Sequence, residues 1–335
     1  MKSDEIIFTS GGTESNNLAI KGAVLAYQSR GKHLITSQIE HSSVTEVFKE
    51  LETAGFRVSY LPVDESGAVR VTDLQAALCD DTILVSIMHV NNEMGRIQPI
   101  AEIGNLLAAY PKVIFHVDAI QSIGKLPFKP KEYRIDLCSA SAHKFRGPKG
   151  AGFLYKREGV QLQSQLVGGG QENGLRSGTE NVPLLVGMAK ALRMSTEQLE
   201  AQMERKYQFR QWLADGIASI PQLMISGTLD REGMAPHIIH FTFPGTKAEV
   251  VVHALEQENI YISTRSACAS SDDKPSDVLV AMGYDHRRAI SGLRVSFSEV
   301  YGEAEAQLFM EKLKHVVDRL VITMKTPNHK KGGRR

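Results

Sequence analysis

The sequence predicts an α/β protein, with a large domain built on a mainly parallel sheet flanked by helices and a smaller C-terminal α/β domain. Short apolar runs alternate with helical stretches through the first part of the chain, with strands at 33–36, 56–61 and 82–88 and helices at 43–54 and 72–78. Such alternation is typical of a parallel sheet with helices on both faces. With 335 residues, 42% of them hydrophobic, the chain is long enough for two domains.

Composition excludes several classes of function. A formal net charge of +1 gives no overall field that would attract nucleic acid or a membrane surface, so neither is expected as a partner. The three cysteines, Cys79, Cys138 and Cys268, lack the spacing of a metal site, and their odd number fits a reducing compartment. We expect Cys79 and Cys138 to be buried as small hydrophobic residues. Without a signal peptide or a long apolar run, the protein is expected in the cytoplasm.

The first residues predict an anion site. A strand at 5–9 runs into the glycine-rich turn Ser10-Gly11-Gly12-Thr13, which begins a helix. Free backbone N–H groups and the helix dipole favour an anion at such a position. Ordinary helix caps use the same residue types, so the turn alone does not separate the two interpretations.

Two strand ends offer a carboxylate and a lysine. The run at 112–118 ends on Asp118, and a second apolar run at 134–137 leads into a serine-rich segment that carries Lys144. Pyridoxal phosphate needs a lysine to hold its aldehyde and a carboxylate to keep its pyridine nitrogen protonated. Ser141 and His143 are suited to hydrogen-bond its phosphate. Most lysines are exposed to solvent and have no special role. Lys144, however, is followed by the turn-forming segment Gly-Pro-Lys-Gly at 147–150, which a flexible surface chain rarely needs.

The remaining elements complete the large domain and form the small one. We expect a helix at 99–110, a strand at 152–156, a glycine-rich loop at 168–179, one long helix at 184–217, strands at 237–243, 260–263 and 291–297, and helices at 248–258 and 302–323. The predicted domains are residues 1–200, which would bind the cofactor, and residues 201–324. Residues 325–335 are predicted to be a basic, disordered tail.

Four motifs together resemble the cysteine desulfurases, which belong to the class V aminotransferases and use pyridoxal phosphate on a fold of type I. The motifs are His116-Val117-Asp118-Ala119 with Gln121, Ser141-Ala142-His143-Lys144, Arg176-Ser177-Gly178-Thr179 and Ser266-Ala267-Cys268. The resemblance extends over almost the whole chain. It implies that L-cysteine is converted to L-alanine while the sulfur becomes a persulfide on an enzyme cysteine. It also implies a homodimer, and an acceptor protein such as an iron–sulfur scaffold or a tRNA-thiolating enzyme.

The resemblance also implies roles for single residues. By themselves, a loop histidine is usually solvated, an Asn-Asn pair before glycine is turn chemistry, and an arginine in a half-buried strand is usually an ion-pair partner. The family pattern instead assigns Lys144, Cys268 and His41 to catalysis, Thr13, Asn92, Asp118, Gln121, Ser141, His143, Lys144 and Thr179 to the cofactor, and Arg294 and Asn92 to the substrate carboxylate. Here Thr179 would reach the phosphate of the neighbouring subunit.

Two features depart from the family pattern. Relatives carry a further N-terminal segment with an Asp-Asn-Ala-Ala-Thr type of motif near the active site, so we expect a shortened member that needs this segment for activity. Members with a long, mobile cysteine loop have glycine where Arg265 stands. Two other interpretations stay open: another pyridoxal phosphate enzyme, either a selenocysteine lyase or an aminotransferase, for which Cys268 is incidental, and a non-catalytic truncated homologue.

Overall fold

The computed structural model describes residues 2–264 and 274–325. Its larger sheet contains β1 (Ile6–Thr9), β2 (His33–Ser37), β3 (Arg57–Leu61), β4 (Thr82–Met88), β5 (Ile114–Asp118), β6 (Leu137–Ser141) and β7 (Gly152–Lys156). The strand order is β1-β7-β6-β5-β4-β2-β3. β3, β2, β4, β5 and β6 are parallel, whereas β7 runs antiparallel to both of its neighbours, β6 and the edge strand β1. The prediction of an α/β fold with a mainly parallel sheet is confirmed.

Alternate residues of the central strands face two separate cores. Leu34, Leu84 and Ile114 pack against α1 (Gly12–Tyr27) and α2 (Ser42–Thr53). Their neighbours Ile35 and Val85, with Phe115, pack against α3 (Val71–Ala77), α4 (Ile100–Leu107) and α5 (Val182–Thr196). Because side chains alternate along a strand, a strand with apolar residues at both parities is covered on both faces. Helices therefore shield the middle of the sheet from water, and polar groups reach the surface mainly at strand ends.

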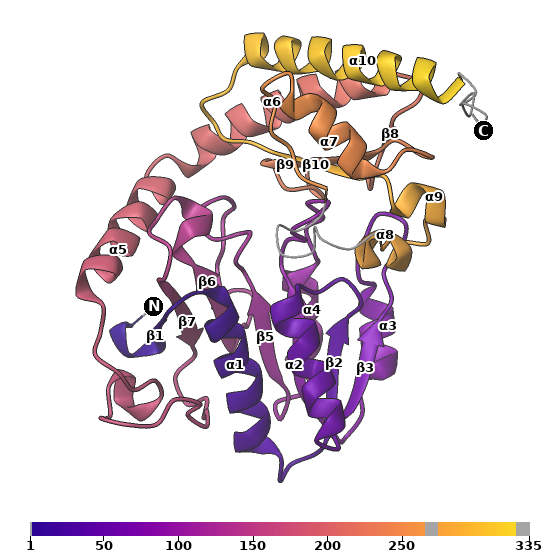
Figure 1. Ribbon diagram of the computed structural model, residues 1–335. Helices are drawn as coiled ribbons and strands as arrows, with labels where there is room; N and C mark the ends of the chain where they lie inside the picture. The colour runs from indigo at the N-terminus through magenta and orange to yellow at the C-terminus, as the bar shows by residue number, and fades with distance from the viewer. Residues whose placement is uncertain (1, 265–273, 326–335) are drawn as a thin grey trace, which may run out of the picture.

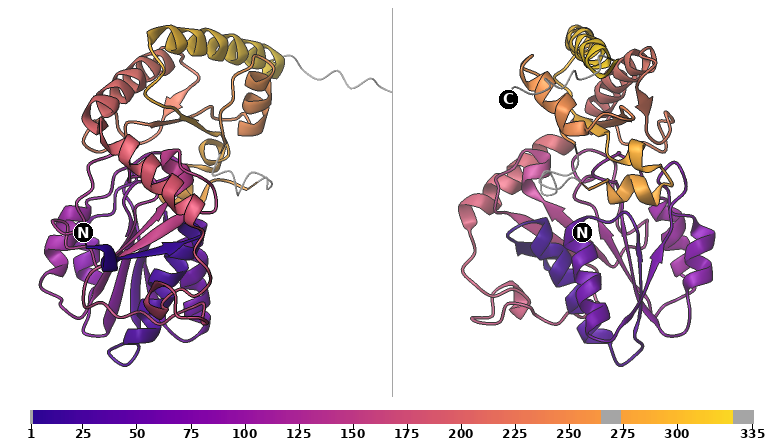
Figure 2. Two further views of the ribbon diagram at one scale, coloured as in Figure 1. Left: turned by 90° about the vertical axis from the view of Figure 1, so that its left-hand side faces the viewer. Right: turned by 45° about the vertical axis from the view of Figure 1, so that its right-hand side comes forward.

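A smaller antiparallel sheet follows the large one. Its strands, in the order β10-β9-β8, are β8 (Met224–Ile225), β9 (Ile238–Thr242) and β10 (Gly292–Ser296). The accompanying helices are α6 (Leu199–Ala218), α7 (Ala248–Glu256), α8 (Asp277–Ala281), α9 (His286–Ala289) and α10 (Glu303–Lys325). α6 and α10 pack together along the outside of this sheet (Figure 2). Figure 1 shows this second layer above the large sheet.

The second layer has its own core and contacts the first layer at several points. Leu213 of α6, Phe241 of β9 and Val316 of α10 are buried in one cluster. α8 instead packs Leu279 against Met88 at the end of β4, within a separate cluster. We propose the domain boundary near residue 200, where α6 begins. None of the described helices combines the length and the apolar composition needed to span a bilayer.

Three local predictions were wrong. The expected helix at 184–217 is two helices, because Gln198 adopts φ −128° and ψ 32° between them. The strand expected at 134–137 begins at Leu137 and contains the serines, whose hydroxyls find partners: Ser139 Oγ lies 3.0 Å from His116 Nε2. The segment at 260–263 contributes only a bridge between Ser263 and Arg294. Of the predicted tail at 325–335, Lys325 ends α10 and the remaining residues lie outside the described part of the chain.

Gly152 in β7 lies very close to Gly11 in the predicted anion site. A Cβ on Gly152 would lie 2.6 Å from Gly11 Cα and 2.7 Å from the Ala140 carbonyl oxygen. We predict that Gly152→Ala lowers the free energy of unfolding by about 1–3 kcal/mol, the usual effect of overpacking, measured by chemical denaturation. Gly187→Ala is the matched control, because its Cβ would meet only ordinary contacts, the nearest at 3.4 Å. Equal denaturation midpoints for both variants would contradict this prediction.

Candidate active site

The carboxyl ends of β5 and β6 bring the predicted carboxylate and lysine to one edge of the large sheet. Asp118 ends β5 and stands opposite Ser139 in the neighbouring strand. β6 leads directly into the short helix η2 (Ala142–Phe145), which carries His143 and Lys144. Asp118 and Lys144 both act on the pKa of His41, Asp118 raising it and Lys144 lowering it. Three predicted catalytic or cofactor residues therefore lie within electrostatic reach of one another.

Asp118 is a buried carboxylate held by two N–H donors. Asp118 is only 4% exposed to solvent. Oδ1 accepts a hydrogen bond from the Ile120 backbone N–H at 3.0 Å, and Oδ2 accepts one from Asn16 Nδ2 at 2.9 Å. Burial raises the pKa of Asp118. Within the described part of the chain, no lysine or arginine forms an ion pair with it. The carboxylate is thus suited to a cationic N–H donor from a ligand.

A pocket at the start of α1 matches the predicted anion site. Its volume is about 330 Å³, and it is lined by Ser10, Gly11, Gly12, Thr13, Glu14, Ser141, His143, Lys149 and Gly150. Gly11 caps the helix at φ 151°, a conformation that favours glycine. Ser141 Oγ and His143 Nδ1 are 2.9 Å apart. The helix N-terminus and the polar side chains around it suit a phosphate group. Thr179, which is exposed, is not among the lining residues.

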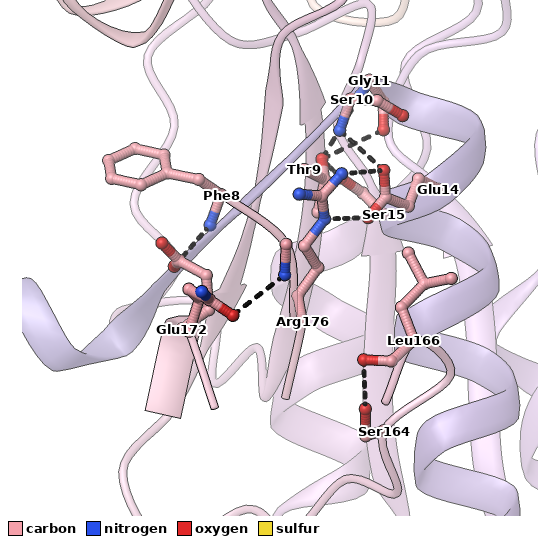
Figure 3. Close-up of polar contacts among 12 residues, drawn as sticks. Phe8, Thr9, Ser10, Gly11, Glu14, Ser15, Ser164, Leu166, Glu172 and Arg176 are labelled. Carbon is pink, nitrogen blue, oxygen red and sulfur yellow. Dashed lines mark hydrogen bonds and ion pairs between the residues drawn. The ribbon is translucent and has the colours of Figure 1, made fainter. Parts of the chain in front are cut away.

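The glycine-rich loop is tied to this pocket by an ion pair that the sequence analysis missed. Arg176 Nε donates to Glu14 Oε1 at 2.8 Å, and Arg176 Nη2 lies 3.4 Å from Oε2 of the same residue (Figure 3). Glu14 also accepts a hydrogen bond from the Ser10 backbone N–H. Further along the loop, Glu172 accepts a hydrogen bond from the Phe8 backbone N–H at 2.9 Å. The loop is therefore anchored on β1 and on the first turn of α1.

A larger cleft lies between the two layers. Its volume is about 920 Å³, and its lining includes Gln121, Lys125, His143, Lys144, His237 and Arg294. Arg294 comes from β10, and its Nη1 donates to the Asn92 carbonyl oxygen at 2.8 Å. Its Nε has no partner among the described residues. Arg294 thus links the small sheet to the turn after β4, and its guanidinium has further N–H donors besides the one given to Asn92.

Gln121 is oriented by a residue that the sequence analysis did not single out. Its Oε1 accepts a hydrogen bond from Lys125 Nζ at 2.7 Å. Burial, with Lys144, Lys206 and Arg294 nearby, lowers the pKa of Lys125 to about 7. Because the Gln121 oxygen is taken by Lys125, its amide N–H₂ is left as the group that can donate to a ligand.

The turn after β4 is held by Asn91, a residue that the sequence analysis did not single out. Asn91 is fully buried, and its Oδ1 accepts hydrogen bonds from the backbone N–H groups of Glu93 and Met94 at 2.9 and 3.0 Å. Its Nδ2 donates to the Ile39 carbonyl oxygen. Asn92 contributes its backbone carbonyl to Arg294. An Asn-Asn pair in the sequence gives no sign of which side chain turns inward.

The cysteines have different surroundings. Cys138 is buried in β6, as predicted, and burial raises its pKa well above the ordinary value. The prediction that Cys79 is buried was wrong: it is exposed in the turn between α3 and β4, where its Sγ accepts a hydrogen bond from Arg57 Nη2 at 3.2 Å. Cys268 and Arg265 lie outside the described residues.

Comparisons with known proteins agree with this geometry. The aminotransferase class V family model matches residues 1–309. A "NifS/IcsS protein homolog" of Lactobacillus delbrueckii subsp. bulgaricus is 48% identical over 92% of this chain and 80% of its own length. A "Cysteine desulfurase IscS" of Clostridium botulinum is 42% identical over 94% of this chain and 79% of its own.

Solved structures show the same fold. A structure named "NIFS-LIKE PROTEIN" superposes with a TM-score of 0.88 at 37% identity, covering 95% of this chain and 84% of the other. A structure described as "SspA in complex with cysteine" superposes with a TM-score of 0.76 at 36% identity, covering 88% and 81% of the two chains.

The Arg176–Glu14 pair yields a prediction about the loop. Both side chains are mostly buried, so losing a charged hydrogen bond should cost more than it does at the surface. We predict that Glu14→Gln speeds amide hydrogen exchange in residues 164–178 by about tenfold or more. Glu197→Gln, which removes an exposed pair with Arg193 on α5, is the control and should leave that exchange unchanged. Equal exchange in both variants and the wild type would show that the pair does not hold the loop.

Proposed function

This chain belongs to the class V aminotransferase family and, within it, to the cysteine desulfurases, and from that premise we propose that it converts L-cysteine to L-alanine and retains the sulfur as a persulfide on Cys268. The observation that carries the proposal is the placement of buried Asp118 and of Lys144 at one edge of the sheet, beside an anion pocket. The solved relative described with bound cysteine supports the choice of substrate.

We propose pyridoxal phosphate as the cofactor, because the residues present fit its three functional ends. The phosphate would lie at the N-terminus of α1 with Thr13, Ser141 and His143, which line the pocket there. Asp118, which has two N–H donors and no ion pair among the described residues, would hold the pyridine nitrogen. Gln121 would donate to the ring, and Lys144 would hold the aldehyde.

When bound, this cofactor supplies an electron sink that weakens the bonds at the substrate Cα. The protein's own groups then have separate tasks. Lys144 Nζ would take the Cα proton, because it is the lysine that follows β6 at the edge shared with Asp118. Arg294, with a donor to spare, would bind the α-carboxylate next to Asn92. His41 would face the substrate thiol.

Cys268 is proposed as the second nucleophile. Its thiolate would attack the substrate sulfur, so that an S–S bond forms while the substrate C–S bond breaks, and the remaining three-carbon unit is protonated to alanine. An aminotransferase needs no such thiol. The persulfide sulfur would then pass to an acceptor protein in the cytoplasm, either an iron–sulfur scaffold or a tRNA-thiolating enzyme.

We also propose a homodimer. Large apolar side chains are exposed in the loop that carries Thr179 and on α5 beside it, and exposed apolar side chains are common where another chain binds. The residues are Leu166, Val167, Val182, Val186 and Met194. In the dimer Thr179 would complete the phosphate site of the other subunit, which agrees with its absence from the pocket of its own chain.

Lys144 gives the first test. We predict that Lys144→Gln removes the covalent attachment of pyridoxal phosphate that borohydride reduction reveals, and lowers turnover by about 10²–10⁴-fold, the contribution of a general base. Peptide mass mapping of the reduced protein locates the attachment. Lys129→Gln, which changes an exposed lysine paired with Glu132, should be normal in both assays. Reduced cofactor on Lys125 or Lys149 in the wild type would contradict the assignment.

Cys268 separates a desulfurase from other enzymes of this cofactor class. We predict that Cys268→Ala and Cys268→Ser still bind the cofactor and exchange the α-proton of cysteine with solvent, yet form almost no persulfide or alanine. The loss follows because neither side chain offers a thiolate. Cys79→Ala should retain turnover. Mass spectrometry after one turnover should find the added sulfur on Cys268. Normal alanine formation by Cys268→Ala would favour a selenocysteine lyase, whereas formation of a 2-keto acid that retains the thiol would favour an aminotransferase.

A further inference from the structure

His41 occupies the N-cap position of α2, where a side-chain acceptor usually stands. Its Nδ1 accepts a hydrogen bond from the Ser43 backbone N–H at 3.1 Å. The hydroxyl of the same residue lies 2.9 Å from Nδ1. Asx and hydroxyl side chains are the common helix caps, so an imidazole in this role is unusual and has consequences for its protonation.

The cap fixes the tautomer of the ring. A backbone N–H can only donate, so Nδ1 must present its lone pair, and the proton of the neutral imidazole is then on Nε2. If Nδ1 were protonated, its N–H would face the Ser43 backbone N–H, and the hydrogen bond that caps α2 would be lost. A helix N-terminus disfavours the imidazolium in the same way, and can hold a histidine as a neutral hydrogen-bond donor.

A buried row of hydrogen bonds supports this arrangement from behind. Asn16 is fully buried, and its Nδ2 donates both to Ser43 Oγ and to Asp118 Oδ2, each at 2.9 Å. Because Ser43 Oγ accepts from Asn16, its own hydrogen is available to point at His41 Nδ1. The row Asp118–Asn16–Ser43–His41 thus joins the buried carboxylate to the histidine, with Asn16 donating to Asp118 on one side and to Ser43 on the other.

The charged groups that face His41 act in opposite directions. Burial lowers the pKa of His41 most, Asp118 raises it, and Lys144 lowers it. The ring is half-buried, and among the described residues no hydrogen bond is formed to its Nε2. The face of the imidazole that remains for a ligand therefore carries an N–H donor.

We propose that His41 works as a neutral imidazole that donates its Nε2–H to the sulfur of the substrate thiolate, and that Asn16 and Ser43 are positioning residues that hold it in this tautomer. The inference rests on the proposed function, since it takes the substrate to be a thiol. His41 then does not act as the base for that thiol: the thiol proton leaves to solvent, and the donated hydrogen bond favours the thiolate that remains.

The first experiment reads the tautomer in the protein without cofactor. Histidine labelled with ¹⁵N is incorporated, and long-range ¹H–¹⁵N spectra of the wild type and His41→Gln identify the His41 signals. The expected result is a pyridine-type Nδ1 and a pyrrole-type Nε2 that do not titrate between about pH 5.5 and 8.5. A proton on Nδ1, or titration near the ordinary pKa of about 6.5, would overturn the proposal.

Ser43 provides matched variants. Ser43→Ala keeps the backbone donor but loses the hydroxyl, so the pKa of His41 should rise, whereas Ser43→Thr retains the hydroxyl and should leave it unchanged. Asn16→Leu should shift the His41 signals in the same direction as Ser43→Ala. A pKa that is the same in Ser43→Ala, Asn16→Leu and the wild type would overturn the role given to the two positioning residues.

The second experiment uses the loaded enzyme. Glutamine can donate a hydrogen bond but cannot take up a proton, so His41→Gln should keep kcat/KM within about tenfold of the wild type, and His41→Leu should lose considerably more. Equal losses of about 10²–10⁴-fold in both variants would indicate a general base and contradict the proposal. If the wild type makes no alanine from cysteine, the proposed function fails, whereas the tautomer is decided separately by the spectra.

Discussion

The buried carboxylate of Asp118 is the constraint on which the rest of the site depends. A carboxylate removed from water is costly unless hydrogen bonds or a counter-charge replace its hydration. The Ile120 backbone N–H and Asn16 Nδ2 supply two hydrogen bonds, and burial still raises its pKa. A ligand with a cationic N–H completes the site and restores the ionised form. β5 lies between β4 and β6, and helices cover both faces of the sheet, so water is kept from hydrating the Asp118 carboxylate.

The second constraint is the junction between the two layers. The turn after β4 is held from the small-sheet side by Arg294, through the Asn92 carbonyl, and by Ser276 Oγ, which donates to Glu93 Oε2 at 2.6 Å. On another side of the cleft, Glu299 pairs with Arg146 of the first layer and with Lys206 of α6. Arg294, which is proposed to bind the substrate carboxylate, is thus fixed against the turn that follows β4. Movement of the small sheet would therefore change the shape of the cleft and the position of Arg294 together.

Strand ends made the main part of this site predictable. Asp118 and Lys144 follow short apolar runs, and the carboxyl ends of parallel strands share one edge of a sheet. Glycine-rich punctuation likewise marked the start of α1. The motifs at Glu14 and Arg176 were both visible in the sequence, but nothing in a single chain tells that residues 162 positions apart form an ion pair.

What the sequence could not predict depends on which side chain turns inward. Asn16 and Ser43 look like ordinary helix-start residues, and their link to Asp118 and His41 exists only after α1 and α2 pack side by side. The break at Gln198 has no glycine or proline to announce it. Cys79 and Cys138 both follow a leucine in the sequence, yet a turn exposes Cys79 and strand β6 buries Cys138.

The state of the cofactor's ring nitrogen tests the central claim most directly. The protein would be loaded with pyridoxal phosphate labelled with ¹⁵N at the pyridine nitrogen, and its ¹⁵N chemical shift measured from pH 7 to 9. If Asp118 holds a cationic N–H, the shift should be that of a protonated pyridine throughout this range, because the carboxylate raises the pKa of its partner. A pyridine-type, unprotonated nitrogen at pH 7 would contradict the account.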